Sequence, residues 1–553
     1  IMPDNTEVYF SEVPDIEKPR SRFDRSKRIQ TTLDAGLLIP IYWDEVYPGD
    51  SITMDFSHVT RMLTPIAPVM DNCWLDVFAF YVPRRLTWEH WKEFNGENTT
   101  GPWAPQINYE IPQIKAPSGG WDVGSLADYM GLPPGIECEE DATPFRAYAL
   151  IWNEWFRDEN LKDPCYISMG DATITGINKG VGYDYVTDTE KGAFPLPVAK
   201  AHDYFTSALP APQRGPSVQL PLGKEAYVRF GDNEAITPGS TNTALLKANA
   251  IIGMDAQLGN EGIVLPFKDD GTDLRTSFDT NKGNRLIADL STATAATITE
   301  LRNAFAVQRY LESMARGGGR YTEVIRNIFG VTSPDARQQR PEYLGGHRFP
   351  INIDQVLQTS STDVVSPQGN TAAYSVTVNA DNLLTYSATE HGMIFVLCAI
   401  RQAHSYAQGI EKKWSRKKLT DFYVPQFSHL SEQPILCKEI YAQGENVTDA
   451  DGNVIDDKVF GYQEAWSELR YSPAQVTGYM RPQVTGSLAI WNYADHYTQL
   501  PYLSGEWIDE TKANIQRTLA VQTGPQFKMD VYMKSYWTRV LPKNSTPGLL
   551  DHF

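Results

Sequence analysis

The chain has 553 residues, of which 41% are hydrophobic, and aromatic side chains are plentiful, with 28 Tyr, 22 Phe and 13 Trp. A net charge of −19 disfavours a surface that binds nucleic acid everywhere, because phosphate contacts need clustered Lys and Arg. No run reaches the ~18 apolar residues of a membrane span, and the first residues lack a signal-peptide core. The 36 Pro and 40 Gly favour strands and long loops over helical bundles.

Residues 1–28 lack hydrophobic periodicity and are predicted to form an extended N-terminal arm. The end of this arm is basic, with Arg20, Arg22, Arg25, Lys27 and Arg28. Two interpretations remain open, a solvated terminus and an internal arm that contacts nucleic acid.

Three strands are predicted between residues 37 and 82. Leu37–Trp43 is apolar, and Ile52, Met54 and Phe56 alternate with polar residues after a turn. Trp74–Val82 is apolar except for Asp76, which predicts a strand buried on both faces. Trp88, Trp91 and Phe94 follow at the spacing of a short helix, which Asn95-Gly96 ends.

The later elements alternate helices and strands. Thr143 is predicted to cap a helix that carries an apolar stripe and ends before Pro164. A capping-box pair at Thr297 and Glu300 predicts a second helix, which glycines 317–319 end. Residues 391–400 predict a buried strand, and residues 527–534 alternate as a half-buried strand.

Residues 219–298 differ from their surroundings, because small and polar residues dominate and aromatic residues become rare. We therefore divide the chain into the arm (1–28), a core made of 29–218 and 299–553, and a surface insertion (219–298). The insertion is expected to be exposed, since loops carry small polar residues and tolerate length changes.

No catalytic, cofactor or metal motif stands out. Gly223-Lys224 lacks the Ser or Thr of a phosphate loop, and the chain contains neither HExxH nor GxSxG. Adjacent carboxylates such as Asp44-Glu45 would point to opposite sides of a strand. Cysteines 73, 138, 165, 398 and 437 form no CxxC pair, which favours reduced thiols in a cytoplasm. We expect no catalytic residues, no cofactor and no metal.

One basic cluster stands out, and it consists of Lys412, Lys413, Trp414, Arg416, Lys417 and Lys418. Cations around an indole can bind phosphates while the ring stacks on a base. A solvated loop, or a contact with an acidic neighbouring subunit, are the alternative interpretations.

Motifs along nearly the whole chain carry a family resemblance. They include TPIAPVMDN at Thr64, FYVPRRLTWEHWKEFNGE ending at Glu97, HDYFTSALPAPQRGP at His202–Pro216, RGGGRYTEVIRNIFGVTSPDARQQRPEYLGGHRFPIN at Arg316–Asn352 and FGYQEAWSELRYSPAQVTG at Phe460–Gly478. These motifs resemble the major capsid protein of the gokushoviruses, single-stranded DNA phages of the Microviridae. The resemblance fades in the arm and in residues 219–298.

The resemblance implies a mainly β fold, an eight-stranded antiparallel jelly-roll β-sandwich of viral capsid type with long inserted loops and a few helices. It implies that sixty copies form a T=1 icosahedral shell around circular single-stranded DNA, in a virion assembled in the cytoplasm of a bacterial host. It implies no catalysis. The implied partners are an internal scaffolding protein, a minor pilot protein, a small basic DNA-binding protein and a host surface receptor.

Members of this family are similar in having protrusions at their threefold axes, built from an insertion in one jelly-roll loop. Residues 219–298 are the candidate for that insertion, with host attachment as its expected role and bracing of neighbouring subunits as the alternative. The apolar residues expected to meet there are Leu245, Leu246, Ile251, Ile252, Ile263 and Leu265. A jelly-roll enzyme or binding protein for glycans, with tryptophans lining a sugar groove, is the rival hypothesis.

Overall fold

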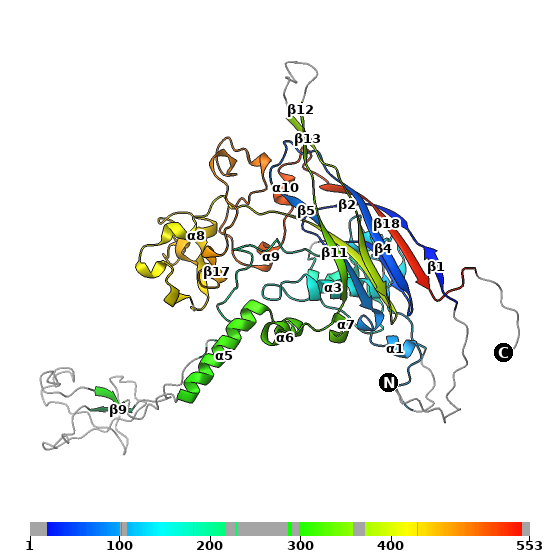
Figure 1. The fold of residues 1–553 in the computed structure, drawn as a ribbon, viewed down its shortest axis with the longest axis horizontal. Coiled ribbons are helices and arrows are strands. Elements are labelled where there is room, and N and C mark those ends of the chain that lie inside the picture. The colour runs from blue at the N-terminus through cyan, green and yellow to red at the C-terminus, as the bar shows by residue number, and fades with distance from the viewer. Residues whose placement is uncertain are drawn as a thin grey trace, which may run out of the picture. The chain divides into compact units, whose positions relative to one another are not determined.

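The computed structural model describes residues 19–99, 101, 108–180, 182–216, 218, 227–230, 286–289, 298–357, 371–428 and 430–544. The chain divides into two compact units. The smaller unit, Gly215–Leu311, contains an antiparallel pair made of β9 (Tyr227–Phe230) and β10 (Leu286–Asp289). Helix α5 (Ile298–Gly317) begins in this unit and ends where the glycine run 317–319 predicts (Figure 1). Thr297, its predicted cap, lies outside the described residues.

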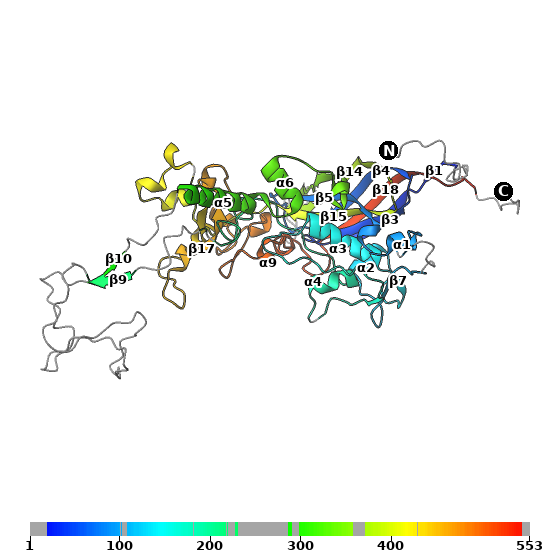
Figure 2. The same cartoon turned by 90° about the horizontal axis from the view of Figure 1, so that it is seen from below.

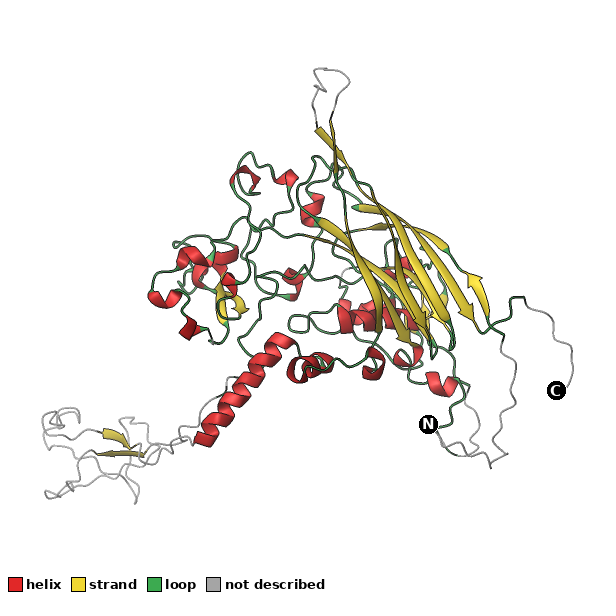
Figure 3. Cartoon of the chain, viewed as in Figure 1, coloured by secondary structure: helices red, strands yellow, loops and turns green. Residues whose placement is uncertain are grey.

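The larger unit is organised around two large antiparallel sheets (Figures 1 and 3). The five-stranded sheet contains β1 (Ser21–Asp24), β2 (Lys27–Leu33), β18 (Phe527–Arg539), β4 (Ser51–Met62) and β14 (Thr377–Ser387). The four-stranded sheet contains β11 (Glu342–Pro350), β5 (Cys73–Pro83), β15 (Gly392–Gln402) and β3 (Ile39–Val46). Every strand pair within these two sheets is antiparallel.

The strand order is that of a jelly roll. Strands β1 and β2 both pair with β18, so they act as one interrupted strand. Successive strands then change sheet at each step, except that β5 and β11 pair directly with each other. This arrangement of eight strands is the two-Greek-key order of a jelly roll. The predicted fold class is confirmed.

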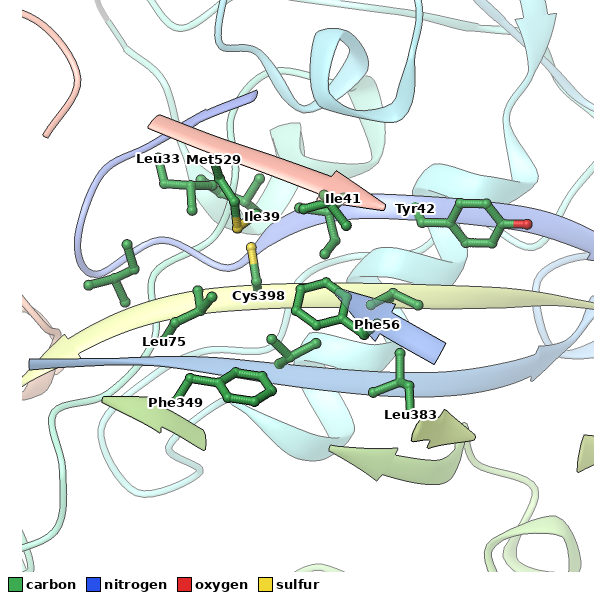
Figure 4. Packing of buried hydrophobic residues seen from close by; sticks show 14 of the residues in the cluster. Leu33, Ile39, Ile41, Tyr42, Phe56, Leu75, Phe349, Leu383, Cys398 and Met529 are labelled. Carbon is green, nitrogen blue, oxygen red and sulfur yellow. The ribbon is translucent and has the colours of Figure 1, made fainter. Parts of the chain in front are cut away.

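The main core lies between the two sheets (Figure 4). Alternate residues of β4, among them Ile52, Met54 and Phe56, point inward and are fully buried, as their spacing predicts. Phe56 stacks on Phe349 of the facing sheet, with ring centroids 6.1 Å apart. Burying such side chains supplies about 1.5–3 kcal/mol each, so the core between the two sheets contributes strongly to stability.

Strands β5 and β15 are buried on both faces, which explains their unbroken apolar sequences. In β15, Val396 and Cys398 face the other sheet, whereas Phe395 and Leu397 belong to a second core. That second core packs the four-stranded sheet against helices α2 (Leu126–Met130) and α3 (Thr143–Trp155). Figure 2 shows these helices on the side of β3 and β15 that is opposite β4 and β18.

Helix α3 begins where Thr143 and Pro144 predict, but the cap differs. The structure places the N-cap at Ala142, and Oδ1 of Asp141 accepts a hydrogen bond from the Thr143 backbone N–H at 2.8 Å. Asp141 therefore satisfies the free N–H group of Thr143 itself, and the Thr143 hydroxyl does not act as the cap. The helix ends at Trp155, well before Pro164.

Asp76, the one polar residue of the predicted central strand, lies between two arginines of neighbouring strands. Its Oδ1 is 2.6 Å from Nε of Arg348 in β11, and its Oδ2 is 3.1 Å from Nη1 of Arg401 in β15. The carboxylate is buried, so these two partners supply the charge compensation that burial requires.

The remaining elements are short. They are α1 (Trp91–Phe94), β6 (Gln113–Lys115), β7 (Glu139–Asp141), β8 (Ile174–Thr175), α4 (Tyr185–Asp188), α6 (Tyr321–Phe329), α7 (Asp335–Gln338), β12 (Asp354–Leu357), β13 (Thr371–Tyr374), β16 (Gln433–Leu436), α8 (Cys437–Ile440), β17 (Val459–Gln463), α9 (Gly505–Ile508) and α10 (Ala513–Gln516). Helix α1 is shorter than the aromatic spacing predicts, because Trp88 lies before its first turn.

Candidate nucleic-acid interface

The basic stretch of the predicted arm is part of the five-stranded sheet. Residues 21–24 and 27–33 form β1 and β2 on β18, while residues 1–18 lie outside the described part of the chain. Arg22 lies over the ring of Tyr536, with its guanidinium carbon 4.1 Å from the ring centroid. Arg20 donates hydrogen bonds to the Gly49 carbonyl and the Ser51 hydroxyl.

Arg25 and Arg28 have carboxylate partners. Nη2 of Arg25 is 2.9 Å from Oδ2 of Asp44, and its guanidinium lies over Trp537 at the end of the core. Nε of Arg28 is 2.9 Å from Oδ1 of Asp530. The hydrogen bond to Asp530 raises the pKa of Arg28, and the same bond lowers the pKa of Asp530, so both groups stay charged. Lys27 is exposed at the sheet edge.

The second basic cluster, residues 412–418, begins with a 3₁₀ turn at Lys412–Ser415. Glu468 lies near two of its cations, with Oε1 3.1 Å from Nη2 of Arg416 and Oε2 3.9 Å from Nζ of Lys412. Lys413 pairs with Glu411. Much of the charge that the sequence leaves unopposed is therefore neutralised within the chain.

The remaining members of this cluster are exposed. Trp414 has an exposed fraction of 76% and Leu419, which follows the cluster, one of 79%. The backbone N–H groups of Lys417 and Lys418 both donate to Oδ2 of Asp421, which fixes the turn while their side chains point into solvent. This part of the surface combines two lysines with large apolar groups.

Several charged and aromatic residues near the arm lie outside the two basic clusters of the sequence. They are Arg61 of β4, and Lys528, Tyr532, Lys534 and Tyr536 of β18. The alternation of residues 527–534 predicts which side chains of β18 face solvent. It places Lys528, Tyr532 and Lys534 on the side opposite the buried residues. Pairing with β1 and β2 adds Arg22 and Arg28 to the same side.

Three further features concern the insertion, metal sites and membrane spans. The six apolar residues of the insertion, 245 to 265, lie outside the described residues. Within the described ranges, no group of three His, Cys, Asp or Glu side chains is arranged to hold a metal ion. Among the helices that the structure describes, none is long and apolar enough to cross a membrane.

A family model and three known proteins that match this chain are all capsid proteins. The family model described as "Capsid protein (F protein)" matches residues 11–549. The chain is 40% identical to "Capsid protein VP1" of Spiroplasma virus 4 over 96% of this chain and 95% of that protein. The chain belongs to the capsid protein (F protein) family. The VP1 capsid proteins of Bdellovibrio phage phiMH2K and Chlamydia phage 1 are 39% and 36% identical, over at least 92% of each chain compared.

Membership in this family confirms the resemblance to the gokushovirus capsid protein. The chain is a structural protein of a virion, it assembles with copies of itself, and it is not an enzyme. The rival glycan-active interpretation is therefore set aside.

Proposed function

We propose that sixty copies of this chain build a T=1 icosahedral shell that encloses a circular single-stranded DNA genome. The jelly-roll sandwich, in a chain that matches capsid proteins along nearly its whole length, is the observation that carries this proposal. A jelly roll protects most strand edges within its two sheets, and its long connections are available for neighbouring copies. The segments 403–526 and 84–341 supply such connections.

The net charge of the chain indicates that another molecule must neutralise the phosphate charge of the genome inside the shell. At −19 per copy, the protein repels DNA on average and attracts it only through local patches. A small basic DNA-binding protein therefore accompanies the genome inside the shell. An internal scaffolding protein acts during assembly, which takes place in the cytoplasm of a bacterial host, and a minor pilot protein completes the particle.

Host attachment is assigned to the insertion, residues 219–298. Its ends fall close to the limits of the compact unit Gly215–Leu311, and it lies between β5 and β11, two strands that pair directly. An insertion at such a connection leaves the sandwich intact, because lengthening a loop costs only about 0.6 kcal/mol per doubling. Three copies meeting at a threefold axis would form the protrusion that a host receptor binds.

Expression of the full chain, with and without a circular single strand, tests this proposal. Electron microscopy should show uniform small closed shells, and full particles should protect the circular strand from nuclease. Full particles from infected cells should also contain a small, strongly basic polypeptide. A chain that remains a soluble monomer under all conditions of assembly would contradict the proposal.

A further inference from the structure

The solvent side of the five-stranded sheet is bare among the residues that the structure describes. The four-stranded sheet is covered on its outer side by α2 and α3, whereas alternate residues of β4 and β18 are exposed or half-buried. We call this side the open face, and it carries Ser57 and Arg61 of β4 with Lys528 and Tyr532 of β18. A polar sheet face that no other described element covers is available to a ligand.

The open face is cationic in an acidic protein. Its cations are Arg22, Arg28, Arg61, Lys528 and Lys534. Its carboxylates are Asp24, Asp55 and Asp530. The excess of positive groups contrasts with the −19 of the whole chain and favours an anionic ligand.

Lys528 and Arg61 lie directly opposite each other on β18 and β4. Both side chains are exposed, and within the described residues neither has a carboxylate partner. Like charges facing each other across two strands destabilise a sheet. An anion held between them would remove that cost, which indicates a site for a phosphate group.

A groove of about 300 Å³ lies next to this pair. Ser57 and Val59 of β4 form its floor, because their side chains are smaller than those on either side. Tyr532 and Arg28 form one wall and Val378 of β14 forms the other. The groove thus combines an aromatic ring, the Arg28–Asp530 ion pair and an apolar side chain around a floor that carries one hydroxyl group.

We propose that the open face binds a segment of the packaged single-stranded DNA, with a base in the groove against Tyr532 and a phosphate between Lys528 and Arg61. The inference rests on the proposed function and names the surface that contacts the genome. Residues 528 and 532 are four positions apart on one strand, about 13 Å, so an extended single strand can reach both. A base stacks on tyrosine without regard to its identity, which suits a protein that packages a whole genome.

Binding of a fluorescent 20-nucleotide oligo(dT) to the full chain, measured by anisotropy at several salt concentrations, tests the inference. The double variant K528Q/R61Q should bind about tenfold more weakly near physiological salt, and its salt slope should fall by about 1.4 because two phosphate contacts are lost. Its melting temperature should stay the same or rise, since the like charges are removed. Tyr532→Leu should weaken binding about fivefold or more, whereas Tyr532→Phe should bind normally.

A matched control removes two exposed lysines elsewhere, at Lys92 in α1 and Lys115 in β6. The K92Q/K115Q variant loses the same charge and should bind like the unmodified chain. Equal weakening by both double variants, or normal binding by K528Q/R61Q or Tyr532→Leu, would overturn the inference. Failure of K528Q/R61Q to form shells, with normal oligo(dT) binding, would instead identify a contact between copies and would also overturn it.

Electron microscopy of the same preparations separates this inference from the proposed function. Shells formed by the unmodified chain and the variants, with unchanged DNA content, would contradict the DNA contact but leave the capsid function intact. Absence of shells from the unmodified chain would contradict the proposed function, and the oligo(dT) comparison would still decide the ligand of the open face.

Discussion

Nδ1 of His404 lies 3.0 Å from Oδ1 of Asp495, and both side chains are buried beyond the end of β15. The other ring nitrogen, Nε2, is 3.1 Å from Oε2 of Glu510. Burial alone would lower the pKa of His404, but its hydrogen bonds to the two carboxylates raise it to about 9. Lys200 and Arg517 also act electrostatically on Asp495, so the site is a buried network that includes an imidazolium ion.

This network makes stability depend on pH. Because the pKa of His404 is raised from 6.5 to about 9, its contribution is fully present below pH 6.5 and is lost as the pH rises through 9. The pKa of Asp495 is lowered, so its contribution is lost only in strong acid. The melting temperature should therefore fall between about pH 7 and pH 9.5, corresponding to a loss on the order of 3 kcal/mol.

The His404→Gln variant should melt lower at pH 7, by an amount equivalent to about 3–5 kcal/mol, because two buried carboxylates lose their cation. It should also lack the alkaline fall of the unmodified chain. His496→Gln, at an exposed histidine nearby, is the control and should retain that fall. An identical alkaline fall in His404→Gln would contradict the assignment.

Asp76 should contribute strongly to stability, because it joins three strands of one sheet. Asp76→Asn leaves the guanidinium of Arg401 poorly compensated in a mostly buried position, while Arg348 is half exposed and can be solvated. We expect a loss of about 2–4 kcal/mol in the free energy of unfolding, measured by urea denaturation. The control Asp55→Asn, whose partner Lys534 is exposed, should change it by less than about 1 kcal/mol. Equal effects of the two changes would contradict this account.

The long strands could be predicted because the pattern of apolar residues in each sequence follows the burial of its two faces. Strand β5 is buried on both faces and is apolar throughout, and β18 is buried on one face and alternates. Strands β1 and β2 could not be predicted in the same way. Their polar residues become a sheet only by pairing with β18, about 500 positions away in the chain.

The candidate site was only partly predictable for the same reason. The cations of cluster 412–418 form a contiguous group in the sequence, but Glu468, which neutralises Lys412 and Arg416, is about 50 residues away. The groove on the open face depends on the register of β4, β14 and β18, which no local pattern specifies. Arg22 and Arg28 were recognised as candidates from their clustering alone.

Cluster 412–418 is expected to contact another copy of the chain more strongly than DNA, because three of its cations are already paired and Trp414 and Leu419 are exposed. The double variant W414A/L419A should fold normally by circular dichroism but form fewer shells in sedimentation. Exposed apolar groups stabilise an isolated subunit little, whereas a buried aromatic anchor in an interface is worth about 2 kcal/mol or more.

Val123→Ala, at an apolar side chain that is even more exposed, is the control for this experiment and should assemble normally. Normal assembly of W414A/L419A, with less DNA retained when Lys417 and Lys418 are changed to Gln, would favour the DNA interpretation instead.

Replacing residues 237–282, which lie outside the described residues, with a short Gly-Ser linker should separate attachment from assembly. Particles should form and retain DNA, because the sandwich does not depend on the length of this connection. They should no longer adsorb to host cells, measured as the fraction of particles that sediment with the cells. Normal adsorption would contradict the proposed role, and failure of assembly would favour the bracing of neighbouring subunits.

The mass of the empty shell tests the central claim most directly. Native mass measurement of shells assembled from the purified chain should give about 3.7 MDa, sixty times the 62.1 kDa of one copy. A single sharp species at that mass is the result expected for a closed T=1 capsid. A broad distribution of masses, or a closed species with another number of copies, would contradict it.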